Sequence, residues 1–282
     1  MSKYLIDSSY LNAINTERKA YFLGFFFADG CMLDDYQANI TLNEKDGYIL
    51  QEFTKDFSYN RPLESKKGKL SIIRGKTYVT RPQKVFRFFR RELNERLKSF
   101  GLCPNKSFVI RVPFEAVDDS LMPHFIRGYF DGDGSVNVAK NTNSAYIMSN
   151  LNFCKDIQGF LKRNGIYSVI RPKGTIYRLY ITRILDFKRF YDLIYTDASI
   201  LLHRKKETFD KLIKNYDWNI HRPIKTKYNS YRGVTFDKRR NKWQTSKKIK
   251  GKVKFLGYFS TAEEAKKVFD KYESHMGETL LL

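Results

Sequence analysis

The sequence predicts an α+β protein that consists of a duplicated domain followed by a small separate module. The first observation is a motif that occurs twice, as FLGFFFADG at residues 22–30 and as FIRGYFDGDG at residues 125–134. The closing Asp29 and Asp133 lie 104 positions apart, and so long a period indicates two copies of one domain rather than a solenoid. The second observation is that half-exposed strand patterns alternate with helical ones. The third is a sharply basic composition after residue 228.

Each motif copy predicts a helix that ends at Gly30 or Gly134, because glycine is common at a helix C-terminus. Thr16 and Glu17 supply a cap for the first helix. Both helices carry a strip of mainly small residues at i, i+4 and i+8, which lie on one face. These strips are Ala20, Gly24 and Ala28 in the first copy, and His124, Gly128 and Gly132 in the second. Since glycine inside a helix otherwise costs ~1 kcal/mol, the strips predict that the two helices pack on each other.

This packing would bring Asp29 and Asp133 together at the same end of the helix pair. Both carboxylates lie where the helix macrodipole is negative, which disfavours each by about 0.3–1 kcal/mol. A divalent cation would compensate for both charges, and Mg²⁺ is usually held by one or two carboxylates together with phosphate oxygens. The repeated pair therefore predicts a Mg²⁺ site, whereas a single Asp-Gly would equally suit a surface turn.

The composition narrows the class of partner. A net charge of +22 over 282 residues indicates nucleic acid or an anionic membrane surface. No segment reaches the ~20 apolar residues of a membrane span, and the N-terminus is not typical of a signal peptide. Cys31, Cys103 and Cys154 are widely spaced, without metal-type clustering. We expect an intracellular protein that is not secreted, has reduced cysteines and does not bind a membrane. Without a Gly-x-x-x-x-Gly-Lys loop, we expect no nucleotide cofactor.

In the first half, residues 37–43 alternate polar and apolar side chains, which predicts a half-exposed strand. Its polar stripe suits hydrogen bonds to base edges, although any solvated sheet face has the same pattern. The stripe consists of Gln37, Asn39, Thr41 and Asn43. The next expected elements are a helix over 46–57, a basic strand pair over 66–74 with a turn at Gly68, and a helix over 85–100.

The second half repeats this plan. A basic turn over 171–174 contains Arg171 and Lys173, which are candidates for DNA contact. The other expected elements are a polar strand hairpin over 137–150 with a turn near 140–143, a helix over 153–164, a strand over 176–182, and helices over 185–195 and 207–216.

Residues 217–228 show no hydrophobic period and are expected to form a linker. Residues 229–277 predict a separate module of three short strands and one helix, which Ser260 or Thr261 would cap. Its strands are basic, as a DNA-binding surface requires. The candidate contact residues are Arg232, Arg239, Arg240, Lys242, Lys247 and Trp243, the last of which would alternatively belong to the core.

The duplicated motif resembles that of the LAGLIDADG homing endonucleases, in their single-chain form with two motif copies. The resemblance implies two αββαββα halves, residues 1–118 and 119–216, related by pseudo-twofold symmetry. It further implies that the motif helices form the interface between the halves and that the sheets form a DNA-binding saddle. In this family the acidic residue at the eighth motif position, here Asp29 and Asp133, binds the catalytic metal.

The sixth motif position is often acidic in the family, but here it is Phe27 in the first copy and Asp131 in the second. The resemblance also implies a basic active-site residue in each half. Lys106 matches this role in the first half, and Lys205 matches it in the second, with Lys206 as the fallback. Such a lysine would offset charge at the scissile phosphate or polarise water, and the alternative is an ordinary solvated cation.

The C-terminal module resembles the APETALA/ethylene-response (AP2) type of DNA-binding domain. The matching segments are YRGV at 231–234, KW at 242–243, LGYF at 256–259 and TAEEA at 261–265. The resemblance implies a three-stranded sheet that lies in the major groove. The chain departs from the plant form after Val234, where the plant arginines are replaced, and the first plant Trp is missing. Base specificity is therefore not implied.

Together the resemblances imply a monomeric, Mg²⁺-dependent endonuclease that cuts both strands of a long double-stranded DNA site. Its role would be the mobility of an intron or a free-standing gene, in phage-infected bacterial cytoplasm or in an organelle. Two alternatives stay open: a maturase that binds intron RNA with the same fold, and a DNA-binding regulator on an inactive nuclease scaffold. Intact Asp29 and Asp133 argue against the regulator and are silent about the maturase.

Overall fold

The computed structural model describes residues 4–73, 76–137, 144–214, 233–237, 239–249 and 252–278. The chain divides into two compact units, Met1–Tyr216 and Asp217–Leu282. The expected linker over 217–228 and the candidate Arg232 lie outside the described residues. Across the described ranges, no helix is both long enough and apolar enough to cross a membrane.

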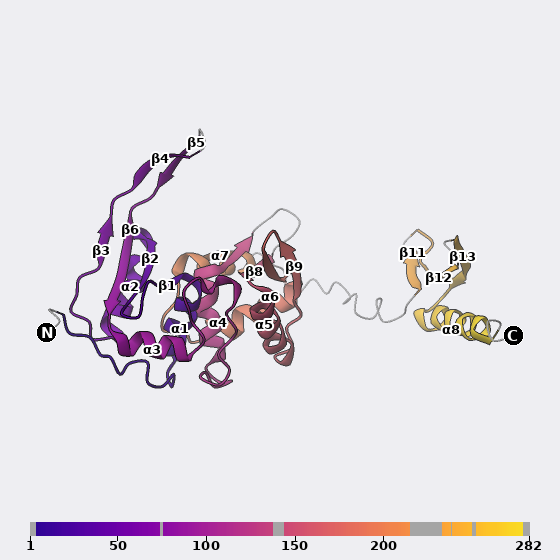
Figure 1. Cartoon of the computed structure of the whole chain (residues 1–282). Coiled ribbons are helices and arrows are strands. Elements are labelled where there is room, and N and C mark those ends of the chain that lie inside the picture. The colour runs from indigo at the N-terminus through magenta and orange to yellow at the C-terminus, as the bar shows by residue number, and fades with distance from the viewer. Residues whose placement is uncertain are drawn as a thin grey trace. The chain divides into compact units, whose positions relative to one another are not determined.

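The first unit consists of two halves that share one plan (Figure 1). The first half contains α1 (Glu17–Asp29), β1 (Gly30–Met32), β2 (Gln37–Asn43), η1 (Glu44–Asp46), α2 (Gly47–Asp56), β3 (Glu64–Lys66), β4 (Lys69–Ile73), β5 (Lys76–Thr80), β6 (Gln83–Phe89), α3 (Arg91–Ser99) and η2 (Lys106–Phe108). The second half contains α4 (Met122–Asp133), β7 (Gly134–Asn137), β8 (Ser144–Ser149), α5 (Leu151–Arg163), β9 (Val169–Lys173), β10 (Ile176–Ile181), α6 (Ile184–Tyr195) and α7 (His203–Lys214).

The main sheets of the two halves have equivalent strand orders, β1-β2-β6-β3 and β7-β8-β10-β9, and every strand pair is antiparallel. Strand β2 has the burial pattern that its sequence predicts. Ala38, Ile40 and Leu42 are buried, while the polar residues between them are half-buried on the outer face. Asn39 pairs across the strands with Arg87 of β6, so the outer face of the sheet also carries a cationic side chain. The duplication predicted from the motif therefore includes the sheet topology.

Two expectations for the first half are wrong. The helix expected over residues 85–100 is strand β6 followed by helix α3, because Phe86 and Phe88 alternate into the core and pair with β2. The strand pair expected over residues 66–74 is also absent, since β3 pairs with β6 while β4 pairs with β5. The chain runs on through Gly68, where an added Cβ would lie 2.5 Å from the carbonyl oxygen of Thr80.

The second half also corrects one expectation. Arg171 and Lys173 lie on strand β9 rather than in a turn. The turn is limited to the two residues between β9 and β10, and its Gly174 has a φ of +62°, which favours glycine. The hairpin expected over residues 137–150 is present as β7 and β8, and its predicted turn lies outside the described residues.

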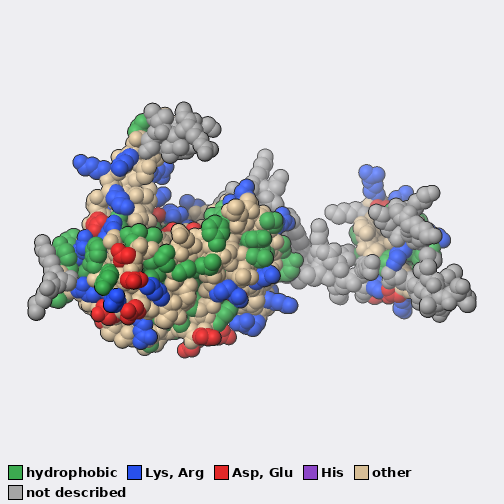
Figure 2. All heavy atoms as spheres, in the orientation of Figure 1, with side chains coloured by type: hydrophobic (Ala, Val, Ile, Leu, Met, Phe, Trp, Pro, Cys, Tyr) green, Lys and Arg blue, Asp and Glu red, His purple; other side chains and the backbone are tan. Residues whose placement is uncertain are grey.

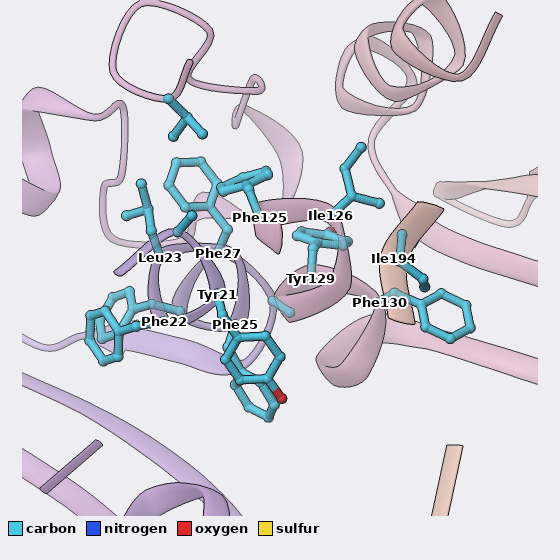
Figure 3. Packing of buried hydrophobic residues seen from close by; sticks show 14 of the residues in the cluster. Tyr21, Phe22, Leu23, Phe25, Phe27, Phe125, Ile126, Tyr129, Phe130 and Ile194 are labelled. Atoms are coloured by element: carbon cyan, nitrogen blue, oxygen red, sulfur yellow. The ribbon is translucent and has the colours of Figure 1, made fainter. Parts of the chain in front are cut away.

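The two motif helices pack directly on each other, as their small-residue strips predict. A Cβ added at Gly24 would lie 1.9 Å from the carbonyl oxygen of Phe125, and one at Gly128 would lie 2.0 Å from that of Tyr21. Buried aromatic side chains surround this contact on both helices (Figure 3). Thr16 caps α1 by accepting a hydrogen bond from the Lys19 amide at 3.4 Å. At both positions any side chain would collide with the backbone of the facing helix, so the close packing of the two helices requires glycine there.

The second unit contains β11 (Val234–Asp237), β12 (Lys242–Ile249), β13 (Lys252–Phe259) and α8 (Ala262–Glu278), with the three strands in one sheet. Thr261 caps α8, since its hydroxyl accepts a hydrogen bond from the Glu264 amide at 3.2 Å. The Glu264 carboxylate in turn accepts one from the Ser260 amide at 3.1 Å. Ala262, Ala265 and Phe269 of the helix are buried. The three strands and one helix expected for this module are present.

Candidate active site

Asp29 is the last residue of α1 and Asp133 is the last residue of α4, so both carboxylates lie at helix C-termini. Because the helices are in contact, the two ends come together. A Cβ added at Gly132 would lie 2.4 Å from the Cβ of Ala28 and 3.1 Å from Oδ2 of Asp29. The small residue before each Asp therefore allows the two carboxylates to approach.

The environment of both carboxylates disfavours their charge. Burial, and then the neighbouring Asp133, raise the pKa of Asp29 to about 6. Burial also raises the pKa of Asp133, although Lys106 and Lys205 act in the opposite direction. The two half-buried carboxylates repel each other when both are charged, and a bound divalent cation would offset this repulsion.

A lysine from each half lies at the end of its own motif helix. Nζ of Lys106 donates a hydrogen bond to the carbonyl oxygen of Ala28 at 2.7 Å. Lys205 is only 6% exposed, and its Nζ lies within 3.1 Å of four carbonyl oxygens, those of Phe130, Asp131, Gly132 and Gly134. Burial lowers the pKa of Lys106 and lowers that of Lys205 to about 8. Lys206 points elsewhere, since its Nζ binds Asp210 at 3.0 Å.

Replacing Lys205 by Met is expected to lower the free energy of unfolding by about 3 kcal/mol, because four buried carbonyl groups lose a charged donor. Lys106→Met should cost less, since its Nζ donates to one carbonyl oxygen, that of Ala28, in the part of the chain that the structure describes. The matched control is Lys206→Met on the same helix, where a partly exposed ion pair is worth about 1 kcal/mol at most. Urea denaturation of the three variants measures these losses. Equal losses at Lys205 and Lys206 would contradict the capping role.

The sixth motif position takes no part in the acidic pair. Phe27 is fully buried and packs edge-on against Phe125, with ring centroids 5.3 Å apart. Asp131 is 1% exposed and accepts hydrogen bonds from the hydroxyl groups of Tyr21 and Tyr195, both at 2.8 Å, and from the Leu202 amide at 2.7 Å. Because Tyr21 belongs to the first half, Asp131 serves to join the halves.

The sequence reasoning missed a second polar link between the halves. Arg127 of α4 is fully buried, and its Nη2 donates to Oε1 of Glu17 on α1 at 2.6 Å. The same guanidinium donates to the carbonyl oxygens of Ile194 at 2.8 Å and Ile200 at 3.0 Å. The sequence did contain a signal for this link. Arg127 is a cation in a motif helix that is otherwise largely apolar, and a buried charge requires polar partners.

The outer faces of the two sheets differ in chemistry. Gln37, Asn39, Thr41 and Asn43 line the first, although Asn43 also caps η1 by accepting from the Lys45 amide at 3.2 Å. Arg171 and Lys173 are exposed on the second. Three further residues on the outer face of the second sheet were not identified from the sequence, namely Tyr146, Arg178 and Tyr180. Cζ of Arg178 lies 4.5 Å from the ring centroid of Tyr146, and Arg178 and Tyr180 alternate with buried residues along β10.

In the second unit, Arg239 and Arg240 are exposed in the turn between β11 and β12, and Lys242 is exposed at the start of β12. Trp243 is half-buried and packs on Phe236, with ring centroids 5.1 Å apart. It shares a strand face with the buried Thr245. Nζ of Lys247 lies 4.8 Å from the ring centroid of Phe269 on α8. Trp243 and Lys247 therefore contribute to packing within the module.

Among the described residues, no group of three or more His, Cys, Asp and Glu side chains could hold a metal ion. The Asp29–Asp133 pair nevertheless fits Mg²⁺, which retains waters and is bound through one or two carboxylates plus substrate phosphates.

A profile of the LAGLIDADG-like domain matches residues 121–195, which run from the start of α4 to the end of α6 and include Asp133. The chain is also 25% identical over 171 residues to elongation factor 2 of Methanopyrus kandleri. That match covers 60% of this chain and 12% of the elongation factor, so the chain spans only a small part of that protein's length.

Solved structures with similar folds include full-length DUF199/WhiA from Thermatoga maritima, at 20% identity and a TM-score of 0.46 over 80% of this chain and 72% of that one. The homing endonuclease I-WcaI bound to its DNA recognition sequence is 11% identical, with a TM-score of 0.48; the match covers 70% of this chain and 90% of that one. The meganuclease I-AabMI bound to uncleaved DNA is 15% identical, with a TM-score of 0.44; the match covers 69% of this chain and 89% of that one. The family match places a LAGLIDADG-like domain at residues 121–195, and the helices and strands of the first unit form a mixed α/β fold.

Proposed function

We propose that the chain is a Mg²⁺-dependent endonuclease that cuts both strands of a long, specific DNA site and so promotes the mobility of an intron or a free-standing gene. The observation that supports this most is the acidic pair, Asp29 and Asp133, at the ends of two helices in contact. Their raised pKa values mark a site that favours a cation. Because one chain supplies both motif copies, a monomer would suffice for both strands.

The reaction would be phosphodiester hydrolysis, in which a water oxygen bonds to phosphorus, the P–O bond to one sugar oxygen breaks, and a proton from the water is transferred, in net terms, to the released sugar oxygen. Mg²⁺ bound by Asp29 and Asp133 would polarise the phosphate and favour ionised water. The helix contact holds the two carboxylates near each other. Among the described residues, Nζ of Lys106 donates to one carbonyl oxygen and Nζ of Lys205 to four, so Lys106 is the better placed lysine to donate to a phosphate oxygen.

DNA would lie on the outer faces of the two sheets and on the C-terminal module, which we propose is AP2-like. The net charge of +22 supports a polyanionic ligand. The polar face of β2 and the arginines of β9 and β10 offer hydrogen-bond donors and acceptors for base edges and phosphates. In the module, the exposed Arg239, Arg240 and Lys242 are the candidate contacts.

Cleavage of a plasmid that carries the gene's flanking genomic sequence tests this function. We expect a linear product with Mg²⁺ and none with EDTA. Binding should weaken by about 10³-fold or more between about 50 and 200 mM salt if about six or more phosphates are neutralised. Specific binding without cutting in Mg²⁺ would overturn the nuclease in favour of a regulator. Intron splicing without DNA cutting would overturn it in favour of a maturase.

A further inference from the structure

The two halves differ at one hairpin. In the second half, Lys173 of β9 pairs with Ile176 of β10, and only Gly174 and Thr175 join them. In the first half, Lys66 of β3 pairs in the same way with Gln83 of β6, but residues 67–82 lie between them. Within that insertion, β4 and β5 pair with each other as a separate two-stranded sheet. Figure 1 shows this β4–β5 arm projecting from the body of the first half.

Among the residues of the β4–β5 arm whose side chains are described, none is buried. The cross-strand pair Leu70 and Val79 is 71% exposed at both residues. An isolated two-stranded hairpin is marginal in water, so burial against a partner would stabilise the arm. The partner's charge is indicated by the sequence, because residues 65–84 contain no Asp or Glu. Lys66, Lys67, Lys69 and Arg81 are exposed, and Figure 2 shows cations along the arm.

We propose that the β4–β5 arm lies in the major groove of double-stranded DNA, beyond the stretch that the first half's sheet covers. A major groove admits a two-stranded β-ribbon, and strands β3 and β6 of the proposed DNA-facing sheet continue directly into the arm. This inference rests on the proposed function for its ligand. Five-residue strands reach about 16 Å, which corresponds to about five base pairs. The bound site is thus longer on the side of the first half.

The deletion variant that tests the proposal is based on the short turn between β9 and β10 in the second half. Residues 67–82 are replaced by Gly-Thr, which joins Lys66 to Gln83 with the same two-residue turn that joins their counterparts. A second variant, K67Q/K69Q, keeps the arm and removes two exposed charges. Its control, K155Q/K162Q, removes two exposed charges from α5. Fluorescence anisotropy with random-sequence DNA duplexes of graded length, in Ca²⁺, gives the affinity, the shortest duplex bound at full affinity, and the salt dependence.

With the arm deleted, the shortest duplex bound at full affinity should shrink by about five base pairs. K67Q/K69Q should reduce the slope of log K against log salt by about 2 units if both lysines contact phosphates, whereas the α5 control should leave it unchanged. Unchanged duplex length and slope in both arm variants would overturn the proposal. Because no step requires cleavage, the plasmid assay can fail or succeed independently of this result.

Discussion

Replacing Asp29 by Asn is expected to abolish DNA cleavage and, at the same time, to make the metal-free protein more stable. The rate should fall by about 10³-fold or more, because stabilisation by a bound metal amounts to several kcal/mol of the barrier. DNA binding should persist, since the variant removes a negative charge from a basic protein. This combination separates a functional carboxylate from a structural one, whose loss would destabilise the fold.

The sign of the stability effect follows from the pKa of Asp29, which is raised from 3.8 to about 6 in the folded protein. Between these values the folded chain binds more protons at this group than the unfolded chain does, so stability falls as the pH rises through this window. Above about pH 6 the full penalty applies, and two pKa units correspond to about 3 kcal/mol. Asn carries no charge and escapes this penalty.

Thermal unfolding on either side of this pH window, with EDTA or with Mg²⁺, measures the effect. We expect the Asp29→Asn variant to unfold at a higher temperature than the parent above about pH 6 and to lose that advantage below about pH 4. Mg²⁺ should stabilise the parent more than the variant. Asp210→Asn is the control, because partners Tyr191 and Lys206 lower the pKa of Asp210 and make its charge favourable. A destabilised Asp29→Asn protein that still cuts DNA would refute the assignment.

The parts of the structure that the sequence predicted are those with local causes. Strand β2 follows from strict alternation over residues 37–43. The helix cap was expected at Ser260 or Thr261, and Thr261 forms it. The helix pair could be predicted because a glycine strip is disfavoured in a helix unless another backbone occupies the space. From that one contact, the placement of Asp29 beside Asp133 follows without further information.

The remaining features depend on partners that are distant in the chain. Residues 83–89 are a strand because β2 and β3 pair with them on either side, which their own Arg- and Phe-rich pattern does not reveal. Lys205 is a cap because the carbonyl groups at the end of α4 converge on its Nζ. Buried Arg127 and Asp131 find their partners on other elements. Local sequence identifies such residues as unusual, but only the tertiary fold shows what satisfies them.

Replacing Gly24 by Ala is expected to lower the free energy of unfolding by about 3 kcal/mol or more. The new methyl group would lie 1.9 Å from the carbonyl oxygen of Phe125, a backbone atom that no rotamer change can move. The helices must therefore separate, and Asp29 and Asp133 separate with them, so DNA cleavage should also be lost. Urea denaturation and the plasmid assay measure the two effects.

The control is Gly159→Ala in α5, where no atom lies within 4 Å of the added Cβ. This change should instead stabilise the protein by about 0.5–1 kcal/mol, since alanine restricts the unfolded chain and favours the helix. Gly128→Ala should cost about as much as Gly24→Ala, because its methyl group meets the carbonyl oxygen of Tyr21 at 2.0 Å. The double variant should cost less than the sum, because either methyl group alone already forces the same two helices apart. Additive losses would show instead that the two close approaches are independent, and the acidic pair would then not depend on one rigid helix contact.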